Sequence, residues 1–120
     1  MRMRFLSTRA HGLIGSLVIT SALTAPAVLR LDDVPASRQL LRLWSAGTMT
    51  LTALTDFEFG AVRVVPMSTH LAIDALVGPA LAAAPWLSGR ASAGRRYWLP
   101  HAIVGGKELF LALITKTRPS

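Results

Sequence analysis

The fold is decided by residues 70–89, which read HLAIDALVGPALAAAPWLSG. Only one side chain in this stretch, that of Asp74, carries a formal charge. A helix rises about 1.5 Å per residue, so the stretch is long enough to cross the roughly 30 Å hydrocarbon core of a bilayer. The segment therefore predicts a transmembrane helix.

Three further apolar stretches of similar length predict three more spans. Residues 97–115 follow a short basic loop and open with aromatic residues typical of the membrane interface. Residues 10–29 contain no formally charged side chain. Residues 37–55 are the weakest span, because Arg38 and Arg42 lie near its start, where long side chains can reach the headgroups. We expect an all-α fold, a four-helix transmembrane bundle.

The composition supports a membrane protein over a soluble helical domain, which remains the alternative. Hydrophobic residues make up 52% of the 120-residue chain and charged residues 16%, below the roughly 25% usual in soluble domains. The net charge is +7, but basic residues gather at the chain ends and between spans, where they anchor helices to headgroups. We expect a multi-pass protein of the cell (plasma) membrane, whose partner is the lipid bilayer. We expect no binding to nucleic acid. The absence of cysteine excludes disulfides and thiolate metal sites.

The two halves of the chain align without gaps when shifted by 59 positions. His11 then falls on His70, and Ala25-Pro26 falls on Ala84-Pro85. Because each unit holds two spans, successive copies enter the membrane from the same side, which makes a parallel repeat. We expect one membrane domain over residues 1–120, built of two helical-hairpin repeats. Their expected bounds are about 10–56 and 69–116, with a linker over 57–68.

Two questions of topology stay open. Residues 1–27 also resemble a signal peptide with a small-residue cleavage site; the match between the first span and residues 70–89 favours a retained helix. Six basic residues lie on each side of the expected membrane, so the positive-inside rule assigns no orientation. Such a tie fits dual topology or a homo-oligomer.

A short motif near the end of the third span carries a resemblance to a known family. Ala84, Pro85, Trp86 and Gly89 resemble the signature of the SPW-repeat family of small bacterial membrane proteins, with Ala84 in place of the serine. The resemblance covers roughly residues 7–118 and implies a repeated two-helix unit. In the first copy Ala27 stands in place of the tryptophan. The family implies no activity.

Four polar residues of the second repeat are the candidate site: His70, Asp74, Lys107 and Glu108. The third and fourth spans are expected to be antiparallel, which places all four at similar depth in one half of the membrane. Ionisable groups inside a bilayer normally face the bundle interior and are paired. Two interpretations are open. The cluster binds a proton, an ion or a polar headgroup, or an Asp74–Lys107 ion pair locks the two helices together.

The histidines allow a metal or haem site as a further interpretation. His11 and His70 correspond in the repeat and share one leaflet, whereas His101 belongs at the opposite surface. We favour interfacial histidines that cap helices or meet headgroups, because no motif such as His-Glu-x-x-His is present. We therefore expect no metal and no cofactor.

No nucleophile–base constellation is visible, so we expect no catalytic residues and no enzyme. The leading expectation is a non-enzymatic structural or accessory membrane component. The alternative is a small transporter or proton- or ion-conducting protein that uses Asp74, Lys107 and Glu108.

Overall fold

The computed structural model describes residues 4–31 and 35–118, and it is all-helical, as expected from the sequence. Its long helices are α1 (Thr8–Val28), α2 (Pro35–Ala53), α3 (Met67–Leu87) and α4 (Arg95–Ile114), with the short 3-10 helix η2 (Arg90–Ala93) before α4. The described residues form no strand, only two isolated bridges.

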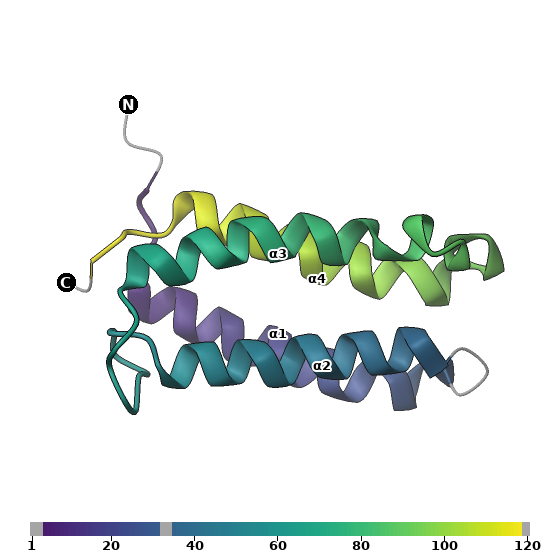
Figure 1. Cartoon of the computed structure of the whole chain (residues 1–120), viewed down its shortest axis with the longest axis horizontal. Helices are drawn as coiled ribbons and strands as arrows, with labels where there is room; N and C mark the ends of the chain where they lie inside the picture. The colour runs from purple at the N-terminus through teal and green to yellow at the C-terminus, as the bar shows by residue number, and fades with distance from the viewer. Residues whose placement is uncertain (1–3, 32–34, 119–120) are drawn as a thin grey trace.

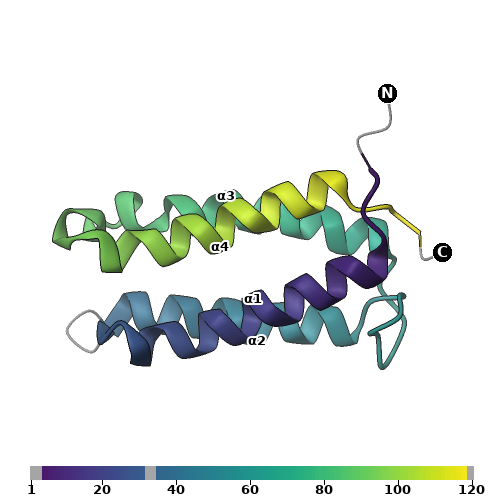
Figure 2. The ribbon, with the colours of Figure 1, turned by 180° about the vertical axis from the view of Figure 1, so that it is seen from behind.

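The four helices make two antiparallel hairpins that lie side by side. One hairpin is α1 with α2 and the other is α3 with α4 (Figure 1). The described ends of the chain and the linker between α2 and α3 lie at the same end of the bundle, which we call the linker end. The turns inside the hairpins lie at the opposite end (Figure 2). The linker end therefore gathers the starts of α1 and α3 and the ends of α2 and α4.

Helix boundaries follow local sequence signals. The Ser7 side chain caps α1 by accepting a hydrogen bond from the backbone N–H of Ala10, 3.1 Å away. Pro35 opens α2, where its missing N–H costs nothing. Gly89 follows α3 with φ of 76°, the left-handed conformation that glycine adopts without steric cost.

The two hairpins differ in how closely their helices approach. In the α3–α4 hairpin, Gly78 and Gly105 face each other, and a Cβ added to Gly78 would lie 2.7 Å from the backbone oxygen of Gly105. Only glycine fits there, so the backbones meet directly. No comparable contact exists at Gly15 or Gly47, the described glycines in the middle of α1 and α2, which face open space.

Buried positions recur at a constant spacing along the chain. The buried residues of α1 are Thr8, His11, Gly12, Ile19, Ala22 and Pro26, and each has a buried residue 59 positions later in α3. In α2 and α4 the spacing is 60, as for Leu41 and His101 and for Ser45 and Gly105, and it holds just beyond the helix ends for Thr55 and Thr115. The extra residue lies in the turn 88–94, which is one residue longer than 29–34.

Matching backbone bridges close the linker end at two places. The N–H of Leu6 donates to the oxygen of Ile114 at 2.9 Å, and the N–H of Val65 donates to the oxygen of Leu54 at 2.8 Å. Leu6 and Val65 are 59 positions apart, whereas Leu54 and Ile114 are 60 apart. Each bridge fixes the start of one helix against the end of another, and so positions the side chains of the first turn.

Two of the described helices, α1 and α3, are long and apolar enough to cross a membrane. The other two are less apolar: α2 carries Arg38 and Arg42 in its first half, and α4 carries charges at both its start and its middle.

Candidate functional site

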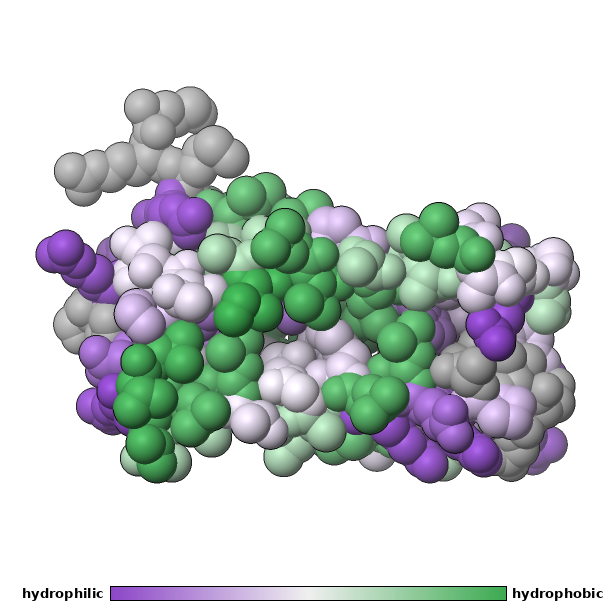
Figure 3. All heavy atoms as spheres, viewed as in Figure 1, coloured by the Kyte–Doolittle hydropathy of each residue, from purple (hydrophilic) through white to green (hydrophobic). Residues whose placement is uncertain are grey.

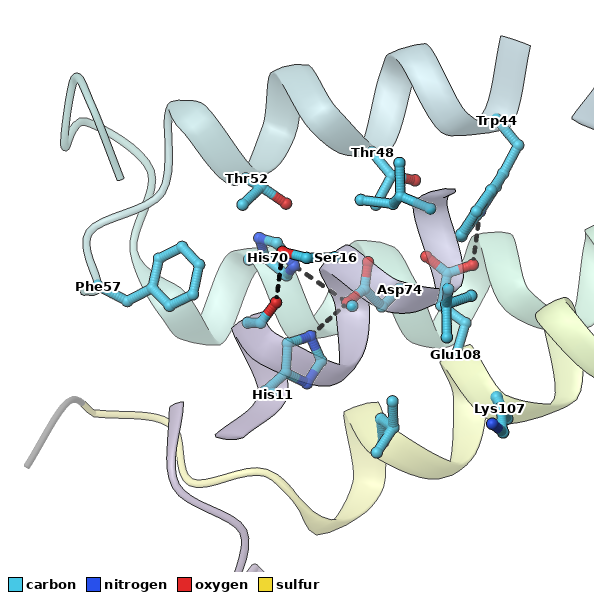
Figure 4. A pocket seen from close by; sticks show the side chains of 15 residues that line it. His11, Ser16, Trp44, Thr48, Thr52, Phe57, His70, Asp74, Lys107 and Glu108 are labelled. Carbon is cyan, nitrogen blue, oxygen red and sulfur yellow. Dashed lines mark hydrogen bonds and ion pairs between the residues drawn. The ribbon is translucent and has the colours of Figure 1, made fainter. Parts of the chain in front are cut away.

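Polar side chains from three helices meet inside the linker half of the bundle. His11 comes from the first turn of α1, His70 and Asp74 come from one face of α3, and Glu108 comes from α4 (Figure 4). All four are buried; His70 is 2% exposed and Asp74 is 3% exposed. Buried ionisable groups are rare unless they are paired, so this cluster is the candidate site.

The Asp74 carboxylate lies between the two imidazoles. Its Oδ2 atom is 3.1 Å from Nε2 of His70, one turn earlier on the same helix, and 3.4 Å from Nε2 of His11. The two rings meet edge to face, with centroids 5.6 Å apart. A single carboxylate oxygen is thus in contact with the Nε2 atoms of both imidazoles.

Two threonines fix the orientation of these rings. The Thr55 hydroxyl donates its proton to the carbonyl of Leu51, so its oxygen is left to accept from Nδ1–H of His70, 2.7 Å away. The Thr115 hydroxyl likewise donates to the carbonyl of Leu111 and accepts from Nδ1–H of His11 at 2.9 Å. These bonds favour hydrogen on Nδ1 in both rings, and Nε2 of each ring faces Asp74.

This arrangement has an electrostatic consequence. A neutral imidazole with hydrogen on Nδ1 presents the Nε2 lone pair, which repels a carboxylate oxygen at 3.1 to 3.4 Å. The contacts become attractive when Nε2 is protonated or when a cation lies between the three atoms. The geometry therefore suits a site that holds positive charge.

Glu108 extends the cluster toward the middle of the bundle. Its Oε2 atom accepts a hydrogen bond from Nε1 of Trp44 on α2 at 2.7 Å. Its carboxyl group also lies within hydrogen-bonding range of the Asp74 carboxyl. Two carboxyl groups this close form a hydrogen bond when one of them holds a proton, and two ionised groups would need a balancing positive charge in an apolar interior.

A small cavity of about 40 Å³ adjoins the four side chains. Serine and threonine side chains of α1 and α2 contribute to its wall, beside the apolar side chains of Val18, Ile19 and Leu111. A cavity of this size holds water or a small ion when polar groups surround it. The cluster is therefore not fully close-packed.

Lys107 is the sequence-predicted site residue that does not join the others. Its side chain is exposed at the rim of the cavity, and Asp74 is paired with the two imidazoles instead. The Asp74–Lys107 ion pair considered from the sequence is thus not formed. Successive helix residues point about 100° apart, because one turn takes about 3.6 residues. Burying Glu108 therefore turns Lys107 outward.

The structure corrects the expectation for His11 and His101. His11 is buried against Asp74 rather than interfacial, and His70 is buried with it. His101, expected at the membrane surface, is 1% exposed, and its Nδ1 is the one buried side-chain nitrogen or oxygen atom without a hydrogen-bond partner among the described residues. It lies seven residues before Glu108, about 10 Å along α4, and does not reach the cluster.

The residues of the sequence motif lie at the opposite end from the cluster. Pro85 is buried near the end of α3 and Ala84 is half-buried beside it. Trp86 packs its ring against Trp98 of α4, with centroids 5.3 Å apart, and Gly89 ends the helix. The motif therefore shapes the turn of the hairpin and is no part of the candidate site.

No protein-family model, no curated protein and no solved structure matches this chain.

Proposed function

We propose that the chain is a multi-pass integral membrane protein of four spans, built of two parallel hairpin repeats. Each helix carries a large apolar side chain on the outside: Leu17 on α1, Leu43 on α2, Leu76 on α3 and Phe110 on α4. They are between 58% and 76% exposed. Exposed apolar surface on every side of a bundle matches a lipid environment better than water. The recurrence of buried positions at spacings of 59 and 60 supports the repeat.

We propose further that the protein binds a cation at the buried cluster and belongs to the class of small proton- or ion-conducting proteins. The observation that carries this proposal is the convergence of two imidazole Nε2 atoms on one buried oxygen of Asp74. Because both Nδ1 atoms are engaged by threonines, the contact calls for a proton or another cation at Nε2. Ionisable side chains inside membrane bundles commonly mark ion and proton pathways.

A lateral groove gives the cluster a route to the outside. The groove lies between α2 and α3, has a volume of about 620 Å³ and reaches Asp74 and Glu108 at its inner end. Figure 3 shows this face, where apolar side chains surround the hollow between the two helices. Its walls are mostly apolar, and the carboxyl groups are the ionisable groups that an entering molecule or ion meets, beside the polar groups of Thr48 and Trp44.

The test is a flux measurement in reconstituted vesicles. One preparation contains an entrapped pH dye and receives an inward driving force for protons. A second contains an entrapped zinc dye and receives an inward driving force for Zn²⁺. We expect flux of one of the two ions in the wild type, the empty-vesicle rate in Asp74→Asn, and full flux in the matched control Asp56→Asn. Asp56 is exposed and lies outside the cluster. Wild-type rates equal to those of empty vesicles in both preparations would contradict the proposal.

A structural or accessory membrane component is the second candidate. One observation favours it: the imidazole nitrogens and carboxyl groups of the cluster bond to one another, to Thr55 and Thr115, or to Trp44. A network of this kind can hold helices together without moving any ion. Equal vesicle rates combined with loss of folding in Asp74→Asn would favour this candidate.

Family membership and assembly stay predictions. The Ala84–Gly89 motif is the support for the SPW-repeat family. The apolar outer surface supports residence in the cell membrane and permits self-association.

A further inference from the structure

We propose that His11, His70 and Asp74 bind one divalent transition-metal ion of the Zn²⁺ type. This inference rests on the cation-binding role proposed above and names the class of ion. The three residues each offer one ligand atom, all are buried, and these atoms all lie within 4.8 Å of one another. They come from two helices that the linker-end bridges hold in place.

The distances fit tetrahedral coordination. Zinc bonds to imidazole nitrogen and carboxylate oxygen at about 2.0–2.1 Å, so neighbouring ligand atoms of a tetrahedron stand about 3.3–3.4 Å apart. The two nitrogen-to-oxygen distances, from Asp74 Oδ2 to His70 Nε2 and to His11 Nε2, are 3.1 Å and 3.4 Å. The third edge, between the two imidazole nitrogens, is no longer than 4.8 Å, and any excess over the tetrahedral edge must close when the ion binds. Two of the three edges are thus already set.

The groups behind the ligands are those that metal sites use. A ligating histidine normally donates its second N–H to an oxygen, which fixes the tautomer and the direction of the lone pair. Thr55 does this for His70 and Thr115 does it for His11, and each threonine is itself fixed by a bond to the carbonyl four residues earlier. Both Nε2 atoms therefore face the same Asp74 oxygen before any ion arrives.

The ligand types and the charge select the class of ion. Imidazole nitrogens with one carboxylate oxygen suit Zn²⁺ and its transition-metal neighbours, whereas Mg²⁺ and Ca²⁺ prefer oxygen ligands alone. The Asp74 carboxylate brings a negative charge to the ion, and the carboxyl group of Glu108 lies within hydrogen-bonding range of Asp74. The adjoining cavity leaves room for a water molecule as the fourth ligand, beside Glu108.

The experiment uses the full chain in detergent, purified through an affinity tag without histidine and stripped with a chelator. Zn²⁺ is titrated by equilibrium dialysis, and Co²⁺ serves as the spectroscopic probe because tetrahedral Co²⁺ absorbs strongly in the visible range. We expect one ion per chain and a tetrahedral Co²⁺ spectrum. His70→Ala and His11→Ala abolish both signals, and Asp56→Asn leaves them unchanged.

Variants of the supporting threonines test the geometry without removing a ligand. Thr55→Val and Thr115→Val keep the side-chain shape and delete the hydroxyl that orients each ring. We expect the affinity for Zn²⁺ to fall by about 10–100-fold, as for other partners of ligating histidines. Thr50→Val is the matched control, because the Thr50 hydroxyl bonds the carbonyl four residues earlier and is exposed; its affinity stays at the wild-type value.

The outcomes separate this inference from the proposed function. Wild-type protein that shows its helical signal and gives only the spectrum of hydrated Co²⁺ overturns the metal site, even when a histidine variant fails to fold. Asp74-dependent proton flux without Zn²⁺ binding also overturns it and leaves the proposed function standing. Zn²⁺ binding without flux of either ion supports the metal site and contradicts ion conduction.

Discussion

His11 and His70 stand 59 positions apart in the chain, and their Nε2 atoms lie 3.4 Å and 3.1 Å from the same oxygen of Asp74. Of the two helices that begin the hairpins, only α3 supplies the acid, because Gly15 occupies the position in α1 that Asp74 occupies in α3. Two halves with matching buried positions in their first helices therefore supply one site instead of two.

Asp74 is the first residue whose removal tests this relationship. Asp74→Ala removes the carboxylate that balances the positive charge held between the two buried imidazoles, so we expect the free energy of unfolding to fall by about 3–5 kcal/mol, as for other broken buried pairs. Thermal unfolding in detergent measures the change. Asp56→Ala, at an exposed position, is expected to stay within about 0.5 kcal/mol of the wild type. A small effect at Asp74 would mean that the two histidines do not depend on it.

The threonines are expected to contribute equally to stability. Thr55→Val and Thr115→Val each leave a buried Nδ1–H without an acceptor, which costs about 1–3 kcal/mol. Thermal unfolding of the two single variants provides the comparison, with Thr50→Val as the control for losing a hydroxyl bonded only to its own helix. Strongly unequal effects would argue against the shared tautomer of the two rings.

The contact between Gly78 and Gly105 predicts a sharp difference between neighbouring glycines. Gly105→Ala forces a methyl group onto the backbone of α3, where Ala82 N would lie 2.6 Å from the new Cβ. We expect a loss of about 1–3 kcal/mol from overpacking, or more where the helices must separate. Gly106→Ala meets nothing within 4 Å and is expected to gain a few tenths to about 1 kcal/mol from helix propensity. Equal losses at the two positions would contradict the close approach of α3 and α4.

Lys107 tests which partner Asp74 has. Its side chain is exposed, so Lys107→Gln is expected to change the free energy of unfolding by less than about 0.5 kcal/mol. Glu108→Leu, in contrast, leaves the Trp44 N–H without its acceptor, and we expect a loss of about 1–3 kcal/mol. Unfolding curves of the two variants give the comparison. A loss at Lys107 as large as that at Asp74 would restore the ion pair between these two residues.

The helices and part of the cluster could be predicted from the sequence. The structure has one helix for each of the expected spans 10–29, 37–55, 70–89 and 97–115. The bounds of each span differ from those of its helix by about three residues or fewer, because apolar runs between polar breaks define helices directly. The contact between His70 and Asp74 was also predictable, since residues four apart share a helix face.

Contacts that depend on helix rotation and on pairing between hairpins could not be predicted. The expected depth in the membrane placed Lys107 and Glu108 level with Asp74, but depth does not determine which of the two faces inward. The role of His11 requires the start of α1 to meet α3, which the backbone bridge of Leu6 to Ile114 arranges. Thr55 and Thr115 gave no signal, because threonines bonded to their own helix are common in such sequences.

The ungapped alignment also misassigned the second helices. A constant shift of 59 pairs Gly47 with Gly106, whereas buried positions there correspond at a spacing of 60, which pairs Ser45 with Gly105. A one-residue difference in turn length leaves no mark in an alignment of weakly similar apolar segments. The spacing becomes visible only from burial, because a shift of one residue rotates a helix by about 100°.

The measurement that tests the central claim most directly is nitrogen NMR of the histidine side chains, with the protein labelled at its imidazoles and reconstituted in lipid. Each line is assigned by its loss in His11→Gln or His70→Gln. The cation site predicts that His11 and His70 both carry hydrogen on Nδ1, while Nε2 is protonated or, after Zn²⁺ is added, bound to the metal. Rings that are neutral with a free Nε2 before and after Zn²⁺ addition, or that carry hydrogen on Nε2 and none on Nδ1, would contradict a buried cation centre.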